Sequence, residues 1–270
     1  MLKTNNLKYI YEDGTIALKN ITIDLNVGNI IGIIGSNGSG KTTLFLNLLG
    51  ILKPTEGEIY LGIDKYRYNK KFLVNLRKSV GIVFQNPDRQ IFYSKVYDDI
   101  AFGLRNLGYD EDEVKERVDR ALKKVDGEDF KDKPVHFLSY GQKKRVAIAG
   151  VLAMDNEVIF FDEPTAGLDP DMERRMIEIL KGISNEGKKI VIASHDMNLI
   201  YRICDYGYVL NRGEILASDK IEKVFLMDDI LEKAKLAEPW LVKLHKNLEI
   251  PLFKKEEELY SYWKNNKNPS

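Results

Sequence analysis

One glycine-rich segment of this chain has the composition and spacing of a phosphate-binding loop. It reads G-x-x-x-x-G-K-T and stands between an apolar run at residues 30–34 and an apolar helical pattern that begins at Leu44. A strand that turns into a helix in this way aims backbone N–H groups and a positive helix end at one point, which suits a polyphosphate better than a merely structural turn. Lys41 would reach the β- and γ-phosphates, and the Thr42 hydroxyl would ligate Mg²⁺. The predicted nucleotide-binding residues are Gly35, Ser36, Asn37, Gly38, Ser39, Gly40, Lys41, Thr42 and Thr43.

Two adjacent carboxylates follow a second apolar run. Asp162 and Glu163 come after residues 158–161 and precede Pro164, which ends a strand because it cannot donate a ladder hydrogen bond. Successive residues of an extended chain point to opposite sides, so the two carboxylates can serve different partners. We assign Asp162 to Mg²⁺ and Glu163 to the attacking water, as its base or orienter. The alternative is a solvated acidic pair at the end of a strand.

Three further residues stand where a nucleotide could contact them. His195 follows an apolar run and has Asp196 beside it, so we expect a contact with the γ-phosphate rather than a structural role. Gln85 follows a short strand and could reach the metal or the water, although glutamine at a strand end is common. Tyr11 precedes a turn at residues 12–14, where its ring would either stack on adenine or pack on the surface.

Three apolar strands must position most of these side chains. Residues 30–34, 158–161 and 190–193 are wholly apolar, as strands are when both faces of a parallel sheet are covered. Ligands of an open parallel sheet sit outside the carboxyl ends of its strands. Because each of the three strands ends at candidate site residues, we expect those residues to share one edge of the sheet.

The other elements are less regular. Residues 58–61 and 81–84 predict short strands, and the alternating apolar residues from Ile21 to Val27 predict a half-buried strand. Apolar residues between 114 and 125 fall on one face of a helix. Beyond residue 220 the pattern predicts short amphipathic helices interrupted at Pro239, and a charged, asparagine-rich end at 254–270 that we expect to fray.

The composition excludes several classes of protein. A chain of 270 residues suffices for one large α/β domain with an appendage or for two smaller domains. Lys plus Arg and Asp plus Glu both number 41, so no overall charge favours a nucleic acid or an acidic membrane surface as partner. The single cysteine, Cys204, excludes an internal disulfide and a cysteine-built metal site. We expect neither a signal peptide nor a membrane span, so another chain would have to form any transport pore.

The segment from Leu138 to Arg145, which reads L-S-Y-G-Q-K-K-R, leads into an apolar helix. Three cations in a first helical turn oppose the helix dipole, so the cluster indicates exposed side chains aimed at something negative. The segment resembles the L-S-G-G-Q signature of ABC transporter ATP-binding subunits. The other motifs match that family in order and spacing from about residue 3 to 220: Gly35 to Thr42, Gln85, 160–163, 166–169 and His195.

The resemblance implies the α/β fold of P-loop NTPases, with a mostly parallel core sheet, an N-terminal antiparallel β-subdomain and a helical subdomain that carries the signature. Two copies would sandwich ATP between the phosphate loop of one and the signature of the other. Ser139 and Gly141, with Gln142 beside them, would contact ATP on the partner chain, and Asp169 would cross the interface. Tyr140 replaces the family's usual glycine; a positive φ there would cost ~1–2 kcal/mol, so we expect its side chain to point away from the nucleotide.

A narrower resemblance follows Gln85. Residues 86–92 and 96–103 are similar to ATPases of energy-coupling factor transporters, which take up vitamins and transition-metal ions, and the chain looks most like the cobalt-uptake ATPases. In that group the region around Gln85 forms a groove for a helix of the membrane protein. The resemblance implies a homodimeric ATPase, peripheral on the cytoplasmic face of the cell membrane. Its partners would be a transmembrane coupling protein and a substrate-binding membrane subunit, with no nucleic acid.

Several alternatives stay open. Cobalt or nickel is favoured over a vitamin only by resemblance. A soluble ABC ATPase acting on ribosomes or DNA usually has two cassettes or a long coiled-coil insertion, and the sequence has neither. A nucleotide-binding regulator without a membrane partner is the third possibility. Residues 1–220 are expected to form the ATPase domain, and residues 221–270 a helical appendage with a role in dimerisation.

Overall fold

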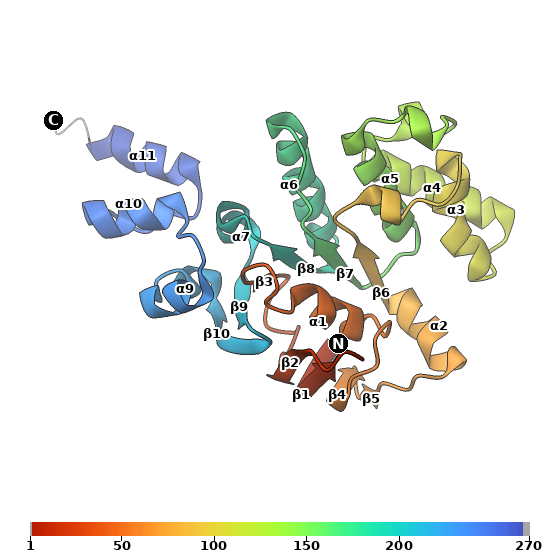
Figure 1. Cartoon of the computed structure of the whole chain (residues 1–270). Helices are drawn as coiled ribbons and strands as arrows, with labels where there is room; N and C mark the ends of the chain where they lie inside the picture. The colour runs from red at the N-terminus through yellow and green to blue at the C-terminus, as the bar shows by residue number, and fades with distance from the viewer. Residues whose placement is uncertain (1, 267–270) are drawn as a thin grey trace.

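The computed structural model describes residues 2–266, whose main sheet has six strands in the order β10-β9-β3-β8-β7-β6 (Figure 1). All neighbouring strands are parallel except β10 and β9, which form a hairpin. The predicted mostly parallel core sheet is therefore confirmed. The strands are β3 (Ile30–Ile34), β6 (Val80–Val83), β7 (Val158–Asp162), β8 (Lys189–Ser194), β9 (Tyr206–Asn211) and β10 (Glu214–Lys220).

The central strands are wholly apolar because each is covered on both faces. Along β3, Ile30 and Ile34 belong to one buried cluster, whereas Ile31 and Ile33 belong to the other. The same alternation divides Ile159 from Phe160 on β7. Helices α5 (Tyr140–Ala153), α6 (Pro170–Asn185) and α7 (Met197–Ile203) supply buried residues to the first cluster, and α1 (Lys41–Leu48) supplies them to the second.

A second, antiparallel sheet has the order β2-β1-β4-β5 and contains β1 (Leu2–Ile10), β2 (Ile16–Ile21), β4 (Glu56–Leu61) and β5 (Asp64–Lys65). The predicted strand from Ile21 to Val27 is wrong in its extent, because β2 ends at Ile21. Ile23 and Leu25 are buried as the alternation predicts, but the Asp24 carboxylate accepts a hydrogen bond from the Asn26 N–H (2.9 Å). Pairing with β1 continues beyond β2 only as an isolated bridge between Lys3 and Asp24.

A helical subdomain lies beyond β6, at the right of Figure 1. It contains α3 (Val96–Asn106), α4 (Glu111–Lys124) and α5, and α2 (Lys70–Ser79) precedes β6. The α4 face predicted to be apolar is buried, including Val114 and Val118. A short 3₁₀ turn at Pro87–Arg89 lies between β6 and α3, and two more, at Glu128–Phe130 and Val135–Phe137, lie between α4 and α5.

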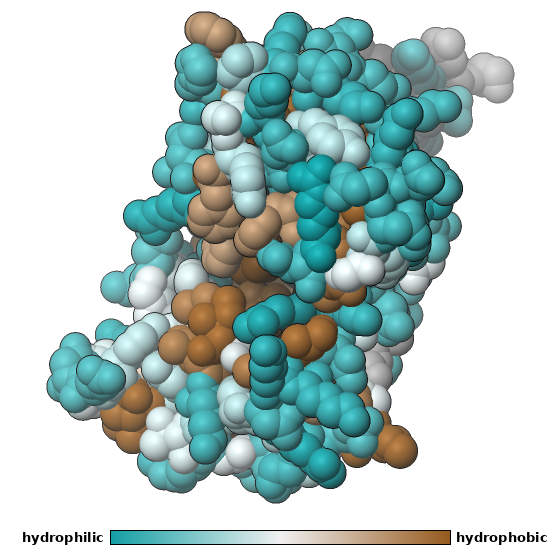
Figure 2. Space-filling view, turned by 90° about the vertical axis from the view of Figure 1, so that its right-hand side faces the viewer, coloured by the Kyte–Doolittle hydropathy of each residue, from teal (hydrophilic) through white to brown (hydrophobic). Residues whose placement is uncertain are grey.

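Hydrophobic residues gather around the middle of the face that this subdomain occupies (Figure 2). Phe92, Tyr93 and Phe102, which we call the aromatic patch, are 76%, 44% and 40% exposed. Their rings contact one another, with centroids 6.5 Å apart for Phe92 and Phe102 and 5.4 Å apart for Tyr93 and Phe102. The Asp99 carboxylate holds the preceding loop by accepting hydrogen bonds from the Phe92 and Tyr93 N–H groups (2.8 and 3.0 Å).

The C-terminal segment folds as α8 (Ile221–Val224), α9 (Asp228–Ala234), α10 (Trp240–Leu248) and α11 (Glu256–Asn266), on the side of the main sheet opposite the helical subdomain (Figure 1). Contrary to the expected fraying, residues 256–266 are helical because Leu259 is buried and the Tyr201 hydroxyl anchors the preceding turn at the Phe253 carbonyl (3.0 Å). Residues 267–270, the rest of that expectation, lie outside the described range. Within residues 2–266, no helix combines the length and apolarity needed to cross a membrane.

Candidate nucleotide-binding site

The glycine-rich loop runs from the end of β3 to the first residue of α1. Gly38 and Gly40 have positive φ (77° and 109°), a conformation that favours glycine. A Cβ on Gly35 would lie 2.2 Å from the Leu210 carbonyl oxygen, so only glycine fits there. Helix α1 has no side-chain N-cap and no acid in its first turn. Its N-terminal N–H groups therefore remain suited to an anionic ligand.

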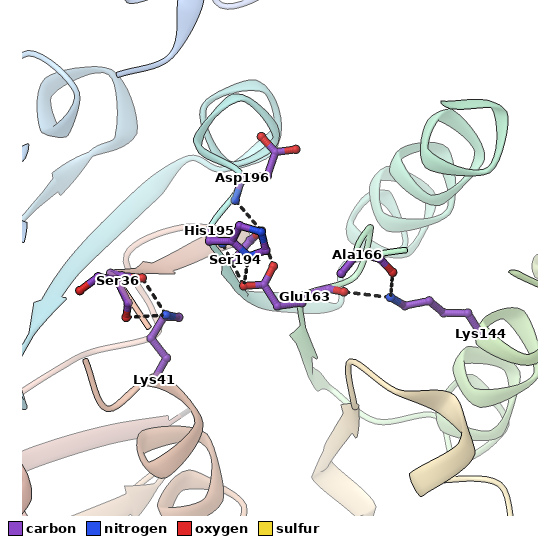
Figure 3. A network of polar contacts seen from close by, with 9 residues as sticks. Ser36, Lys41, Lys144, Glu163, Ala166, Ser194, His195 and Asp196 are labelled. Atoms are coloured by element: carbon purple, nitrogen blue, oxygen red, sulfur yellow. Dashed lines mark hydrogen bonds and ion pairs between the residues drawn. The ribbon is translucent and has the colours of Figure 1, made fainter. Parts of the chain in front are cut away.

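Lys41 is curled back over this loop. Its ammonium donates hydrogen bonds to the main-chain carbonyls of Gly35 (2.7 Å) and Ser36 (3.1 Å), as Figure 3 shows. Burial lowers the pKa of Lys41, while the nearby carboxylates of Glu163 and Asp162 raise it. Neutral carbonyls are weaker partners for an ammonium than phosphate oxygens are. The side chain is thus arranged to exchange its acceptors when a phosphate enters.

Asp162 and Glu163 both line the same groove, at the carboxyl end of β7. Burial raises the pKa of Asp162 and so does Glu163, whereas Lys41 and a hydrogen bond with the Thr42 hydroxyl lower it. The expectation of an extended chain through the pair is wrong, because Glu163 has a left-handed φ of 48°. The strand ends at Asp162 and the chain turns at Glu163, so this turn sets the relative direction of the two carboxylates.

The Glu163 carboxylate is held by the end of the neighbouring strand β8 (Figure 3). Its Oε2 accepts a hydrogen bond from the Ser194 hydroxyl (2.9 Å). Its Oε1 accepts one from the His195 N–H (3.0 Å) and lies 2.7 Å from the His195 ring Nδ1. Sequence reasoning missed Ser194, whose only signal was its place between an apolar strand and His195.

The groove has a volume of about 550 Å³ and joins most of the predicted site residues. Tyr11 stands at its edge, and its hydroxyl shares a 2.8 Å hydrogen bond with the Thr43 hydroxyl. Gln85 reaches it from the end of β6. Sequence reasoning missed further lining residues, and nothing in their local sequence distinguishes them. They come from β2, from the residue before it and from the turn between β9 and β10: Thr15, Ile16, Ala17, Lys19 and Arg212.

Eight predicted residues do not line this groove: Gly35, Ser36, Ser39, His195, Ser139, Gly141, Gln142 and Asp169. The first three belong to the glycine-rich loop itself, and His195 contacts the Glu163 carboxylate. Ser139 and Gln142 form a capping box at the start of α5, in which the Ser139 N–H donates to the Gln142 side chain (2.9 Å). The Asp169 carboxylate caps α6 by accepting from the Met172 N–H (2.9 Å). Within one chain, Ser139, Gln142 and Asp169 therefore serve as helix-capping residues.

The three cations at the start of α5 do not form an exposed cluster, so that expectation is wrong. Lys144 is fully buried, and its ammonium donates to the carbonyls of Glu163 (2.9 Å) and Ala166 (3.3 Å). Arg145 donates to the carbonyls of residues 125 and 126 (3.2 and 2.7 Å). Lys143 forms an ion pair with the Asp88 carboxylate at 2.7 Å. Lys144 and Arg145 are thus placed here to donate hydrogen bonds to main-chain carbonyls.

Tyr140 occupies the first turn of α5 and is not among the described residues with positive φ. Its hydroxyl donates a 3.0 Å hydrogen bond to the main-chain carbonyl of Gln85. The backbone at Tyr140 is therefore not left-handed. The Tyr140 side chain points toward Gln85, just beyond the end of β6.

The oxygen atoms that could act as metal ligands in the groove suit a hard divalent cation such as Mg²⁺. Thr42, Asp162 and Gln85 offer a hydroxyl, a carboxylate and an amide oxygen, and all three line the groove. Within residues 2–266, no group of three or more His, Cys, Asp and Glu side chains could hold a metal ion. A Mg²⁺ ion here would take its remaining ligands from phosphates and water, as this ion commonly does.

Known proteins resemble this chain along most of its length. The profile of the family described as ABC transporter matches residues 18–166. The cobalt import ATP-binding protein CbiO of Salmonella paratyphi A is 45% identical, over 96% of both chains. The energy-coupling factor transporter ATP-binding protein EcfA of Methanosphaera stadtmanae is 44% identical, over 92% of this chain and 90% of its own. The solved structure of CbiO1 from Clostridium perfringens, described as part of the ABC transporter complex cbiONQ, matches with a TM-score of 0.78. It is 44% identical and covers 92% of this chain and 98% of its own.

Proposed function

Because the chain belongs to the ABC transporter family and is an ATP-binding ATPase of the energy-coupling factor type, we propose that its hydrolysis of ATP energises the import of cobalt or nickel ions. The observation that carries the catalytic part is the placement of Glu163. Its carboxylate lines the same groove as Lys41 and Thr42, and two residues of the neighbouring strand end hold it there.

In this proposal the glycine-rich loop and the N–H groups of α1 bind the phosphates. Lys41 leaves the carbonyls of Gly35 and Ser36 and donates to the β- and γ-phosphates instead. Thr42, Asp162 and Gln85 would hold Mg²⁺, which supplies neutralising charge on the phosphates when bound. Glu163 orients the attacking water and accepts its proton, and His195 contacts the γ-phosphate. Tyr11, whose hydroxyl is hydrogen-bonded to the Thr43 hydroxyl, would lie beside the nucleoside.

We further propose that a second copy of the chain completes each site. Ser139, Gly141, Gln142 and Asp169 lie outside the groove of their own chain and are available to a nucleotide bound by the partner. The appendage at residues 221–270 exposes Leu248 and Tyr260, which we assign to contacts between the two copies. The ATPase domain at residues 1–220 would then carry the ATP sandwich.

The membrane partner would dock at the aromatic patch. Its three residues are exposed. Asp88, which pairs with Lys143, belongs to the short turn at Pro87–Arg89 that precedes Phe92 in the sequence. An apolar patch with a polar rim is typical of a surface that binds another protein. We assign to it a helix of a transmembrane coupling protein, which places the chain peripherally on the cytoplasmic face of the cell membrane. A substrate-binding membrane subunit would complete the importer.

The substrate proposal rests on the CbiO relative, whose name specifies cobalt import. The name of the EcfA relative specifies no substrate. A vitamin is the second candidate substrate, because the energy-coupling factor transporters that the sequence resembles also take up vitamins. Purification of the tagged chain from detergent-solubilised native membranes tests the importer. We expect a transmembrane coupling protein and a substrate-binding subunit to co-purify, and vesicles containing the complex to accumulate ⁵⁷Co²⁺ only with internal ATP.

A matched pair of variants makes this test specific to the proposed surface. Phe92→Asp should abolish co-purification of the membrane proteins while the isolated chain keeps its ATPase activity. Ile63→Asp is the control, because Ile63 is 96% exposed in the turn between β4 and β5, outside the patch. Equal co-purification with both variants would refute the docking surface. Vesicles that accumulate a vitamin and no ⁵⁷Co²⁺ would refute the metal substrate and leave the importer intact.

A further inference from the structure

Lys144 is a fully buried lysine beside the catalytic machinery. It comes from the first turns of α5 and ends at the segment that follows β7, as Figure 3 shows. Its ammonium donates hydrogen bonds to the main-chain carbonyls of Glu163 (2.9 Å) and Ala166 (3.3 Å). A buried ammonium is costly unless it is paired and hydrogen-bonded. A neutral side chain of similar length would fill the same space at lower cost, so the charge indicates a role beyond packing.

The residue that Lys144 holds is in an unusual conformation. Glu163 has a φ of 48°, in the left-handed region where a residue with a side chain is strained. Such a conformation persists only where the surroundings impose it. The Glu163 N–H donates to the Ala193 carbonyl (2.8 Å), and the Glu163 carbonyl accepts from Lys144. Both sides of the strained residue are thus fixed by hydrogen bonds from other elements.

Tyr140 lies one turn earlier on the same helix and packs against the same segment. Its ring centroid is 5.8 Å from the Lys144 nitrogen, within the range of a cation–π contact. A Cβ on Gly167 would lie 3.2 Å from the Tyr140 ring, and the Tyr140 hydroxyl donates to the Gln85 carbonyl. The first turns of α5 therefore contact both loops that supply Gln85 and Glu163 to the groove.

We propose that Lys144 is a positioning residue for the carboxylate of Glu163. It does not touch the nucleotide; it fixes the main chain of Glu163 in the left-handed turn that directs the carboxylate into the groove. The inference rests on the proposed ATPase mechanism, in which Glu163 acts on water. The hydrogen bond from Lys144 also links Glu163 to α5. A displacement of the signature residues at the start of α5 would therefore move Glu163 of the same chain.

The test compares Lys144→Met with Lys188→Met in the purified full-length chain. Lys144→Met keeps most of the length of the side chain and removes its donors. Lys188 is a matched control, since its side chain is 13% exposed and its ammonium donates to the main-chain carbonyl of Asn156 (2.9 Å) at the other end of the sheet. We expect kcat for ATP hydrolysis to fall at least tenfold in Lys144→Met, with the ATP dissociation constant and the number of ATP sites per chain unchanged. Lys188→Met should keep kcat within twofold.

A loss of folding is separated from a loss of positioning by the number of ATP sites. A purely structural role would lower this number and kcat together, and that result would overturn the inference. Lys144→Gln keeps one amide donor and should restore part of kcat if the hydrogen bond to Glu163 is what matters. Wild-type kcat in both Lys144 variants would also overturn it. Absence of hydrolysis in the wild-type chain would instead contradict the proposed ATPase mechanism.

Discussion

Nδ1 of His195 lies 2.7 Å from Oε1 of Glu163, so the imidazole and the carboxylate share a hydrogen bond across the ends of β8 and β7. An ionised carboxylate can only accept, which assigns the proton to Nδ1 and leaves Nε2 of a neutral ring as an acceptor. A ring in that state cannot donate to a γ-phosphate. We infer that His195 must either gain a second proton or release Glu163 when ATP binds, and release would free the carboxylate for water.

The substitution Glu163→Gln tests the role of this carboxylate. The amide cannot accept a proton from water, so hydrolysis should fall by about 10²–10⁴-fold while ATP binding is retained. The variant should accumulate as a closed dimer, which size-exclusion chromatography with and without ATP will detect. Rapid ATP hydrolysis by this variant would refute the role of Glu163 as the acceptor of the proton from water.

The substitution Lys41→Ala tests the phosphate loop. Removal of the ammonium deletes the charge expected to meet the β- and γ-phosphates, and ATP affinity should fall at least about 100-fold, equivalent to roughly 3 kcal/mol. Isothermal titration calorimetry with ATP and Mg²⁺ measures the effect. Lys3→Ala is the control, because Lys3 pairs with Asp24 at 2.9 Å on the antiparallel sheet. Equal affinities in both variants would contradict the prediction.

Two glycines should respond differently to replacement by alanine: one substitution should abolish ATP binding, and the other should raise the free energy of unfolding. In Gly35→Ala the new Cβ would meet the Leu210 carbonyl oxygen at 2.2 Å, so the loop must shift and ATP binding should be lost. Gly182 lies inside α6 with nothing within 4 Å of a Cβ, and Gly182→Ala should stabilise the fold by about 1 kcal/mol. Thermal unfolding and ATP titration of both proteins check this. Destabilisation by Gly182→Ala would contradict the prediction.

The buried ammonium of Lys144 should make stability depend on pH. Burial lowers the pKa of Lys144 from 10.5 to about 8. Between these values the unfolded chain binds a proton that the folded chain has released, so raising the pH favours the folded state. From pH 8 to 10.5, the free energy of unfolding should increase by up to about 3 kcal/mol relative to Lys144→Met, which lacks the group. Urea denaturation of both proteins measures the difference, and a constant difference over this range would exclude the shift.

The sequence by itself determined the features that depend on neighbouring residues. The glycine-rich loop, the apolar strands and the residues at their ends are contiguous patterns, and parallel strands must bring their carboxyl ends to one edge. That rule predicts the meeting of Lys41, Asp162 and Glu163, which all line one groove. Burial on both faces likewise makes β3, β7 and β8 recognisable without any tertiary information.

Only the tertiary structure decided features that depend on residues distant in the chain. The partners of Lys144 lie 19 and 22 residues away, and Ser194 reaches Glu163 across 31 residues, so no local pattern reports either contact. Helix α11 forms in a charged segment because Leu259 is buried against the rest of the chain. The turn at Glu163 is set by hydrogen bonds from β8 and α5 rather than by its own side chain, because long-range contacts can override local backbone preference.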